Sequence, residues 1–302
     1  MSFLSETKQE ICKIPVDHKC CALAEACGVL LYGNAFSRDG IRIMTESKDF
    51  ARRLPRLFQR AFDVSFDTLP DLERKGKLQL QMINKEKIER VFDLYGYGNA
   101  HSVSLHINFA LLESTCCRNA FFRGAFLAGG FVTNPEKGYH LELLTSHSYV
   151  SREMATLLQE EGFSPKETAR GANQVVYFKQ SEAIEDYLTT VGAPVAATKV
   201  MMAKVEKDLR NRVNRRVNCD AANLDKAIEA AQSHLEAIRR LDTGIGLHTL
   251  PEKLQETAAL RMAHPELTLS ELAEQFDPPV TKSCLHHRLR KLSNLAKESG
   301  RL

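Results

Sequence analysis

The feature that most constrains the fold is an internal repeat in the first two thirds of the chain. Residues 18–96 and 116–192 show the same order of expected elements, and the glycines that follow the first helix of each copy, Gly28 and Gly130, are 102 residues apart. A repeat of this kind buries its apolar face by packing against its neighbour. The two copies are therefore expected to pack on each other.

Each copy is expected to fold as α-β-β-α-β-β-α. The first helix is rich in small residues and ends at its glycine, because glycine suits a helix C-terminus. Alternation and turn residues predict strands at 29–36, 41–45, 64–66 and 78–83, and at 131–133, 139–145, 163–167 and 174–178; amphipathic periodicity predicts helices at 48–62, 85–95, 147–161 and 181–191. The pattern indicates an α+β domain with pseudo-twofold symmetry, and two unrelated α+β halves are the alternative.

Small side chains on the two first helices suit a close backbone contact between the copies. They are Ala22, Ala24 and Ala26 in one copy and Gly124, Ala125, Ala128 and Gly129 in the other. At these residues the sequence resembles the LAGLIDADG homing-endonuclease fold, whose signature helices lie at the interface of two repeats. Aligned by the terminal glycine, residues 20–28 and 122–130 take the nine motif positions.

The resemblance also indicates where a nuclease of that family would hold its metal. The last acidic residue of each motif binds the divalent cation that activates water for phosphodiester cleavage. Cys27 and Gly129 occupy these positions, and neither can ligate magnesium; Glu25 has Leu127 as its counterpart. A metal-dependent homing endonuclease is therefore the least favoured function, and the sequence assigns no catalytic residue, metal or cofactor.

The positive charge of the chain is concentrated near its C-terminus. The chain has 41 Lys and Arg against 38 Asp and Glu, but residues 1–198 carry a net charge of −1 and residues 199–302 carry +4. Nucleic-acid binding normally requires a clear positive surface. The repeat region is therefore expected to act as a protein-contact scaffold or to make weak accessory contacts with DNA.

A basic helical segment follows Gly192 and Pro194. Residues 204–216 carry a net charge of +4, and the candidates for accessory phosphate contacts are Lys204, Lys207, Arg212, Arg215 and Arg216. A solvated helix face explains such a run of charge equally well. Four asparagines are expected to interrupt the helix pattern and to serve as caps or backbone hydrogen-bonding groups. They are Asn211, Asn214, Asn218 and Asn223.

The C-terminal segment predicts four helices. An amphipathic helix is expected at 225–241, with its apolar stripe at Ile228, Ala231, Leu235, Ile238 and Leu241, and another at 251–263. Thr268 and Glu271 have the spacing of a capping box, which predicts a short helix from Thr268 to about Gln275. Pro278 and Pro279 break that helix, and Thr281 caps the last one.

Two short helices with a tight break, the second amphipathic and basic, are typical of a helix-turn-helix. The first turns of the last helix would present Lys282, Ser283, His286 and His287 to base edges or phosphates, and Arg290 and Lys291 are better placed for phosphates. The full candidate DNA-binding set is Thr268, Thr281, Lys282, Ser283, His286, His287, Arg288, Arg290, Lys291 and Asn294. A helical bundle for protein contact is the alternative.

The eight cysteines are expected to be reduced, partly buried thiols. None of them forms the C-x-x-C pairs that zinc sites usually require, so a structural zinc is not expected. The N-terminal segment does not resemble a signal peptide, and no apolar run is long enough for a membrane span. These features predict a cytoplasmic protein without membrane partners.

Nearly the whole chain resembles the WhiA family of Gram-positive bacteria. The segments that carry the resemblance are Phe121–Gly130, Pro135–Glu142, Asn211–Cys219 and Lys282–Leu292. The corresponding domain organisation is an N-terminal helical extension at 1–17, the LAGLIDADG-like domain at 18–195, a basic helical linker at 196–224 and a helix-turn-helix domain at 225–302, with the motif itself at about 268–301.

The resemblance implies a non-enzymatic, nucleoid-associated DNA-binding protein. It would regulate transcription and act in cell division and chromosome segregation, or in sporulation in sporulating relatives. Double-stranded DNA is the implied partner, and other regulatory proteins are possible partners. A protein-interaction scaffold with weak non-specific DNA binding is the alternative, and the sequence leaves the oligomeric state and the DNA target open.

Overall fold

The computed structural model describes residues 2–73, 76–97 and 104–299. The chain divides into two compact units, Met1–Asp208 and Leu209–Leu302. The first unit contains helices and two antiparallel sheets, and every element of the second is helical, so the expected α+β domain followed by an all-α domain is confirmed. Among the described residues, no helix has both the length and the apolar character needed to cross a membrane.

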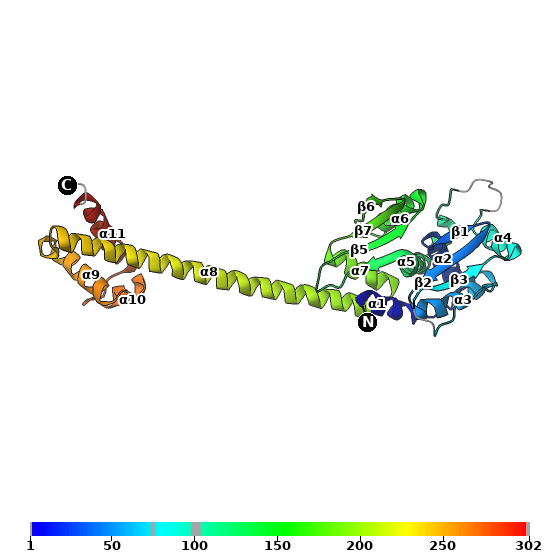
Figure 1. Ribbon diagram of the computed structural model, residues 1–302, viewed down its shortest axis with the longest axis horizontal. Coiled ribbons are helices and arrows are strands. Elements are labelled where there is room, and N and C mark those ends of the chain that lie inside the picture. The colour runs from blue at the N-terminus through cyan, green and yellow to red at the C-terminus, as the bar shows by residue number, and fades with distance from the viewer. Residues whose placement is uncertain (1, 74–75, 98–103, 300–302) are drawn as a thin grey trace. The chain divides into compact units, whose positions relative to one another are not determined.

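The first unit begins with α1 (Phe3–Cys12) and then contains the two repeats (Figure 1). The first repeat comprises α2 (Lys19–Leu31), β1 (Ala35–Ser37), β2 (Gly40–Thr45), α3 (Lys48–Phe62), β3 (Leu78–Met82) and α4 (Lys85–Leu94). After the short 3-10 helix η1 (Phe109–Leu112), the second comprises α5 (Thr115–Gly129), β4 (Gly130–Val132), β5 (Leu141–Thr145), α6 (Ser148–Glu160), β6 (Lys166–Arg170), β7 (Asn173–Phe178) and α7 (Ser181–Val191).

Each repeat has its own antiparallel sheet. The strand order is β1-β2-β3 in the first and β4-β5-β7-β6 in the second. Ile43 pairs with Leu80 in the first sheet and Leu143 with Val176 in the second, and all four side chains are buried. Equivalent strands of the two repeats therefore present apolar side chains to the core, as period-two alternation predicts.

In the first repeat, the expected strand at 29–36 is right only at its end, where β1 covers Ala35–Ser37, and the expected strand at 64–66 is wrong. Residues 29–31 continue α2, because their side chains are buried in the core beside α5. Val64 and Phe66 are also buried, but their segment is not a strand, and only Thr68 forms an isolated bridge with Gln81. The apolar alternation of this segment correctly indicates that its side chains are buried, but residues 64–66 are not part of a sheet.

Helices α2 and α5 lie side by side between the two sheets (Figure 1). A Cβ atom on Gly28 would lie 2.3 Å from the carbonyl oxygen of Phe121, and one on Gly124 would lie 2.0 Å from that of Glu25. Only glycine allows backbones to approach this closely. The expectation that α2 ends at Gly28 is wrong: Gly28 lies inside the helix, at the crossing with α5.

The second unit consists of the C-terminal part of α8 (Pro194–Gly244), η2 (Leu247–Thr249), α9 (Glu252–Ala263), α10 (Leu269–Glu274) and α11 (Lys282–Ser299). Helix α8 is continuous over 51 residues and includes both the predicted linker and the predicted helix 225–241. The expected interruption at Asn211, Asn214, Asn218 and Asn223 is wrong. All four are exposed. At an exposed helical position, asparagine lowers helix stability by only about 0.5 kcal/mol relative to alanine.

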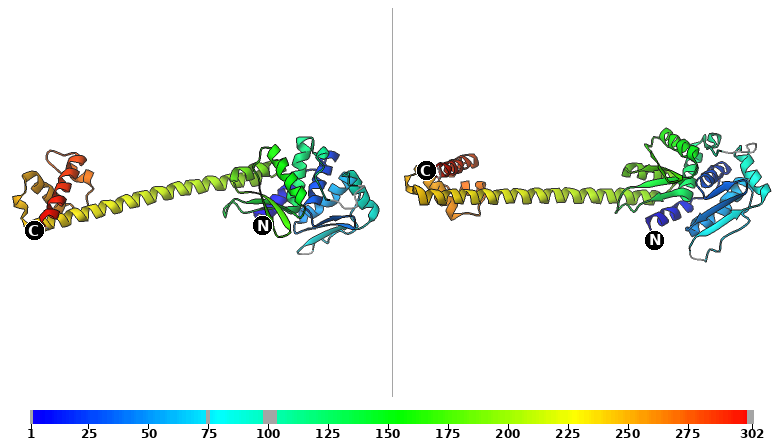
Figure 2. Two further views of the ribbon diagram at one scale, coloured as in Figure 1. Left: turned by 90° about the horizontal axis from the view of Figure 1, so that it is seen from above. Right: turned by 45° about the horizontal axis from the view of Figure 1, so that its top comes forward.

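Helices α9, α10 and α11 gather around the C-terminal end of α8 (Figure 2). Their shared core is small and apolar: Ala237, Ile238, Leu241, Leu250, Leu254, Ala258, Leu272, Ala273, Phe276, Leu285, Leu289, Leu292 and Ala296. The predicted stripe of α8 reaches this core with Ile238 and Leu241, whereas Ile228 is 47% exposed. This separate core makes the helix-turn-helix region a structural unit of its own.

Candidate nucleic-acid interface

Helix α10 begins at a complete capping box, as the sequence predicts. The Thr268 hydroxyl accepts a hydrogen bond from the Glu271 amide at 3.3 Å, and the Glu271 carboxylate accepts one from the Thr268 amide at 2.9 Å. These bonds to Thr268 hold the pKa of Glu271 below its usual value. The reciprocal bonds satisfy two backbone donors at the start of a helix of only six residues.

The position of α11 is set by its cap and its apolar stripe. The Thr281 hydroxyl accepts a hydrogen bond from the Cys284 amide at 3.2 Å, and the Val280 amide donates to the Ala273 carbonyl at 3.0 Å across the break. Leu285, Leu289 and Leu292 are each at most 1% exposed. Because this stripe is buried against α9 and α10, the opposite face of α11 must point away from the unit.

That opposite face contains most of the predicted DNA-binding residues. Lys282, Ser283, His286, His287, Arg290, Lys291 and Asn294 are all exposed. In the described part of the chain, Lys282, Arg290 and Lys291 have no carboxylate within ion-pair distance. Their charges are therefore available to an external anion.

Arg288 differs from its neighbours on α11. Its guanidinium lies 5.4 Å from the centre of the Phe276 ring and 3.6 Å from the Glu256 carboxylate on α9, and its side chain is 15% exposed. Phe276 itself is buried in the core. The structure thus places Arg288 among the contacts that hold α11 to α9 and to the break, apart from the exposed basic face.

Sequence reasoning did not identify a second buried arginine that shapes the motif. Arg261 on α9 is 2% exposed and donates to the carbonyls of His264 at 3.2 Å and Leu267 at 2.8 Å, which orders the segment leading into α10. The same arginine affects a histidine on α8. Burial lowers the pKa of His234, and its electrostatic interactions with Arg261 and His286 lower it further. The lowered pKa favours the neutral form of the His234 ring.

The five predicted accessory residues of α8 are placed in two different settings. Lys204 forms an ion pair with Glu182 on α7, and the Lys207 ammonium lies 5.3 Å from the centre of the Tyr139 ring; both residues belong to the first unit. Arg212, Arg215 and Arg216 belong to the second unit and are exposed. Among the described residues, these three arginines have no ion-pair partner.

Among the described residues, the positions that correspond to the metal ligands of LAGLIDADG nucleases carry no carboxylate pair. The reciprocal contact of Gly28 with Gly124 makes residues 96 positions apart equivalent across the helix pair, so Gly33 rather than Cys27 is the counterpart of Gly129. Cys27 is buried at the interface. Neither glycine offers a ligand atom, so the absence of the nuclease carboxylates holds for this alignment as well.

The one buried carboxylate on α2 is fully engaged. Glu25 binds Arg53 on α3 through two hydrogen bonds of 2.6 and 2.8 Å, and its second oxygen lies 3.3 Å from the Arg123 guanidinium on α5. Glu25 is 2% exposed and Arg53 is 6% exposed. This ion-pair cluster joins the two repeats and is structural, a role that sequence reasoning did not assign.

Two family models match the chain. The model described as the WhiA LAGLIDADG-like domain matches residues 118–210, and the model described as the WhiA C-terminal HTH domain matches residues 213–296. A relative from Ruminiclostridium cellulolyticum is 38% identical, over 98% of this chain and 97% of its own length. The chain belongs to the WhiA family. The family suggested by the sequence is thus confirmed.

Other WhiA relatives are similar over their whole length. A protein of Alkaliphilus metalliredigens is 32% identical, over 100% of this chain and 99% of its own, and one of Staphylococcus aureus is 35% identical, over 98% and 96%. All three relatives are named "Probable cell division protein WhiA". The crystal structure of full-length WhiA from Thermatoga maritima matches 99% of both chains with a TM-score of 0.61 at 21% identity, which shows a shared fold.

Proposed function

We propose that the chain is a non-enzymatic DNA-binding regulator that inserts α11 into the major groove of double-stranded DNA. The observation that carries the proposal is the exposed basic face of α11, whose lysines and arginine have no ion-pair partner among the described residues. The buried apolar stripe of α11 and the capped helix α10 hold this face in place. A helix of this kind fits the major groove, where side chains of its first turns reach base edges.

The residues of α11 divide by position along the helix. Lys282, Ser283, His286 and His287 lie in its first two turns and would contact base edges or nearby phosphates. Arg290, Lys291 and Asn294 follow and would contact phosphates. Thr268 and Thr281 contribute through the caps that fix α10 and α11, and Arg288 contributes by packing on Phe276.

Helix α8 adds a second source of positive charge. Arg212, Arg215 and Arg216 are exposed without carboxylate partners in the described chain and would make accessory phosphate contacts. Lys204 and Lys207 are engaged with the first unit and would contribute less. We therefore rank the three arginines above the two lysines among the five residues that the sequence suggests for accessory phosphate contacts.

The names of the relatives support a role in cell division, and a DNA-binding regulator there would act in the cytoplasm, on the nucleoid. The proposed targets are genes of cell division and chromosome segregation.

The glycines at the former metal positions support the absence of nuclease activity, because a hard cation needs carboxylate oxygens. Other regulatory proteins would contact the LAGLIDADG-like domain.

The test is fluorescence anisotropy of the full chain with duplex DNA in the presence of magnesium. Reversal of charge in Arg290→Glu with Lys291→Glu is expected to weaken binding by at least about tenfold, since two phosphate contacts become repulsive. The matched control is Lys85→Glu with Lys166→Glu, which makes the same change in net charge at exposed positions of the first unit.

The control variant is expected to bind like the natural chain, and the DNA is expected to remain uncut. Equal loss in both variants, or no binding by the natural chain at physiological salt, would contradict the proposal and favour a protein-interaction scaffold. Cleavage of the DNA would contradict the assignment of a non-enzymatic protein.

A further inference from the structure

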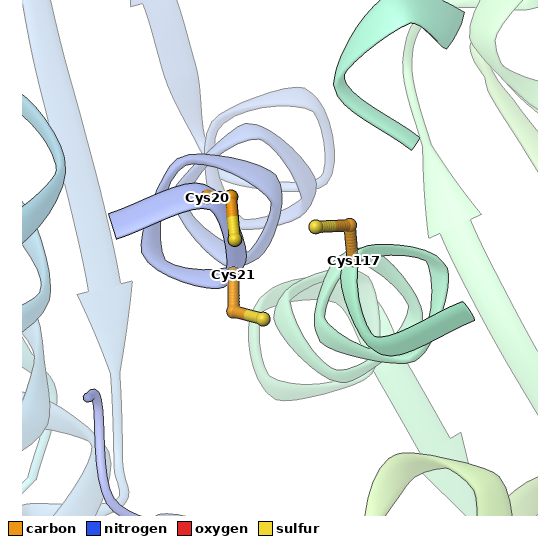
Figure 3. Close-up of side chains that lie close together, drawn as sticks. All are labelled: Cys20, Cys21 and Cys117. Carbon is orange, nitrogen blue, oxygen red and sulfur yellow. The ribbon is translucent and has the colours of Figure 1, made fainter. Parts of the chain in front are cut away.

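Three thiols converge where the two repeats meet. Cys20 and Cys21 lie in the first turn of α2, and Cys117 lies in the first turn of α5. The three Sγ atoms all lie within 4.8 Å of one another (Figure 3). Cys20 is exposed, Cys21 is half-buried and Cys117 is buried, so the cluster is reachable from solvent and closed at its base.

A fourth thiol neighbours the group but lies outside its 4.8 Å spread. Cys116 precedes Cys117 at the start of α5 and is exposed. Its thiol interacts with that of Cys21 across the repeat interface. The thiols of Cys20 and Cys117 are neighbours across the same interface. Each repeat thus contributes two adjacent cysteines, and the two pairs are 96 residues apart, like Gly28 and Gly124.

The chemistry of the donors selects the kind of metal. Four sulfur ligands favour a soft or borderline cation and disfavour magnesium or calcium, which require oxygen. Zinc bound by four thiolates holds its sulfurs about 3.8 Å apart, as follows from a Zn–S distance of about 2.3 Å in a tetrahedron. The Sγ atoms of Cys20, Cys21 and Cys117 therefore have to approach one another by up to roughly 1 Å, and the Cys116 side chain, which lies outside this group, has to turn toward them.

The cluster lies at the N-terminal ends of two helices, where unpaired backbone amides and the helix dipole stabilise negative charge. It lies at the opposite end of α2 from Gly33, so it is distinct from the former nuclease metal position. The sequence expectation of no zinc site rests only on spacing along the chain, which takes no account of thiols that two repeats bring together.

We propose that Cys20, Cys21, Cys116 and Cys117 bind one zinc ion that ties the N-terminal ends of α2 and α5 together across the repeat interface. The ion would replace four thiol protons and act as a structural cross-link. The proposal is independent of DNA binding by α11, because none of the four cysteines lies in the second unit.

The first test is metal binding by the full reduced chain. Purified without chelator, the chain is expected to contain close to one zinc per molecule by elemental analysis. After replacement of zinc by cobalt, we expect a thiolate-to-cobalt charge-transfer band and the intense visible bands of tetrahedral cobalt. A reduced chain that takes up neither metal would overturn the proposal, whatever the behaviour of any variant.

Variants locate the ligands. Cys20→Ser with Cys117→Ser is expected to abolish the cobalt bands, and Cys116→Ser alone to weaken zinc affinity by more than about tenfold, since loss of one ligand costs at least as much as loss of an outer-shell partner. The matched control is Cys219→Ser with Cys284→Ser, which removes two exposed cysteines elsewhere. Unchanged bands in the first variant, or their loss in the control, would contradict the assignment.

A disulfide is the competing fate of the same thiols. If the natural chain isolated in air holds no zinc and has a mass lower by two or four hydrogens, and reduction does not restore metal uptake, the cluster is a redox pair and the proposal fails. We expect instead full alkylation after chelation and protection from alkylation while zinc is bound. Circular dichroism of each variant separates loss of a ligand from loss of the fold.

Discussion

The helix pairs α2–α5 and α10–α11 use charge in opposite ways. Between α2 and α5, backbones touch at glycines and the buried charges of Glu25, Arg53 and Arg123 satisfy one another. On α11, the apolar side is buried and the basic side faces solvent without ion-pair partners among the described residues. The first pair uses its charges to hold a fold together, and the second leaves them for a ligand.

This difference shows why the LAGLIDADG-like fold does not depend on which residues occupy the nuclease metal positions. The close contact at Gly28 and Gly124 depends on small residues and is unaffected by what occupies the former metal positions. The observed contacts of the helix pair, at its glycines and in its ion-pair cluster, are structural ones. Function is then expected where charge remains unpaired, in the second unit and on the adjoining part of α8.

The largest effect is expected from breaking the buried ion-pair cluster. Glu25→Ala leaves the buried Arg53 guanidinium without a counter-ion and should lower the free energy of unfolding by about 3–5 kcal/mol. Thermal and urea denaturation measure this change. The control is Arg52→Ala, which removes an exposed pair with Asp49 and should cost less than about 1 kcal/mol. Equal effects of the two substitutions would contradict a structural role for the cluster.

The next effect tests the backbone contact. Gly124→Ala places a methyl group 2.0 Å from the Glu25 carbonyl oxygen, so α2 and α5 must move apart, at a cost of about 1–3 kcal/mol. Gly138→Ala is the control, because its Cβ would meet nothing within 4 Å. If Gly124→Ala unfolds at the same denaturant concentration as the control, the helices are not held at the observed distance.

A smaller effect is expected in the second unit. Thr268→Ala removes the side-chain half of the capping box and should destabilise α10 by about 1 kcal/mol. Hydrogen exchange of the α10 and α11 amides reports this locally, and DNA affinity should fall in parallel as α11 loses its support. Thr243→Ala, at an exposed hydroxyl that bonds only within α8, should change neither quantity. Faster exchange without any loss of DNA affinity would separate α10 from the binding function.

The smallest effect is expected from the accessory arginines. Replacing Arg212, Arg215 and Arg216 with alanine should weaken DNA binding roughly threefold to tenfold, because exposed phosphate contacts are individually weak. Replacing Asn211, Asn214 and Asn218 with alanine on the same helix leaves the charge unchanged and should leave anisotropy titrations unchanged. A loss larger than that caused by reversing Arg290 and Lys291 would make α8 the main DNA-binding surface.

The sequence predicts correctly those features that depend only on neighbouring residues, such as helix bounds and caps. Amphipathic periodicity predicts the helix at 48–62 to the residue, and in the structure Ser47 caps its start and Asp63 ends it in the left-handed conformation. The capping box at Thr268 was equally clear. The apolar stripe of α11 predicted which face is buried and therefore which predicted DNA-binding residues are exposed.

The errors came from features that depend on the partner element. A glycine at a helix end and a glycine at a helix crossing have the same local sequence context, which misplaced the end of α2 and with it the position equivalent to Gly129. Arg288 flanks the apolar stripe in sequence, and only the placement of Phe276 and Glu256 reveals its inward contacts. The thiol cluster is visible only when the two repeats are packed against each other.

The central claim is that DNA contacts α11 and not the LAGLIDADG-like domain. The most direct test is the salt dependence of DNA affinity for the natural full chain, for Arg290→Glu with Lys291→Glu, and for Lys85→Glu with Lys166→Glu. The slope of log affinity against log salt should become shallower by about two in the α11 variant, since each phosphate contact contributes about 0.9, and should not change in the first-unit variant. A slope that falls only in the first-unit variant would contradict the account.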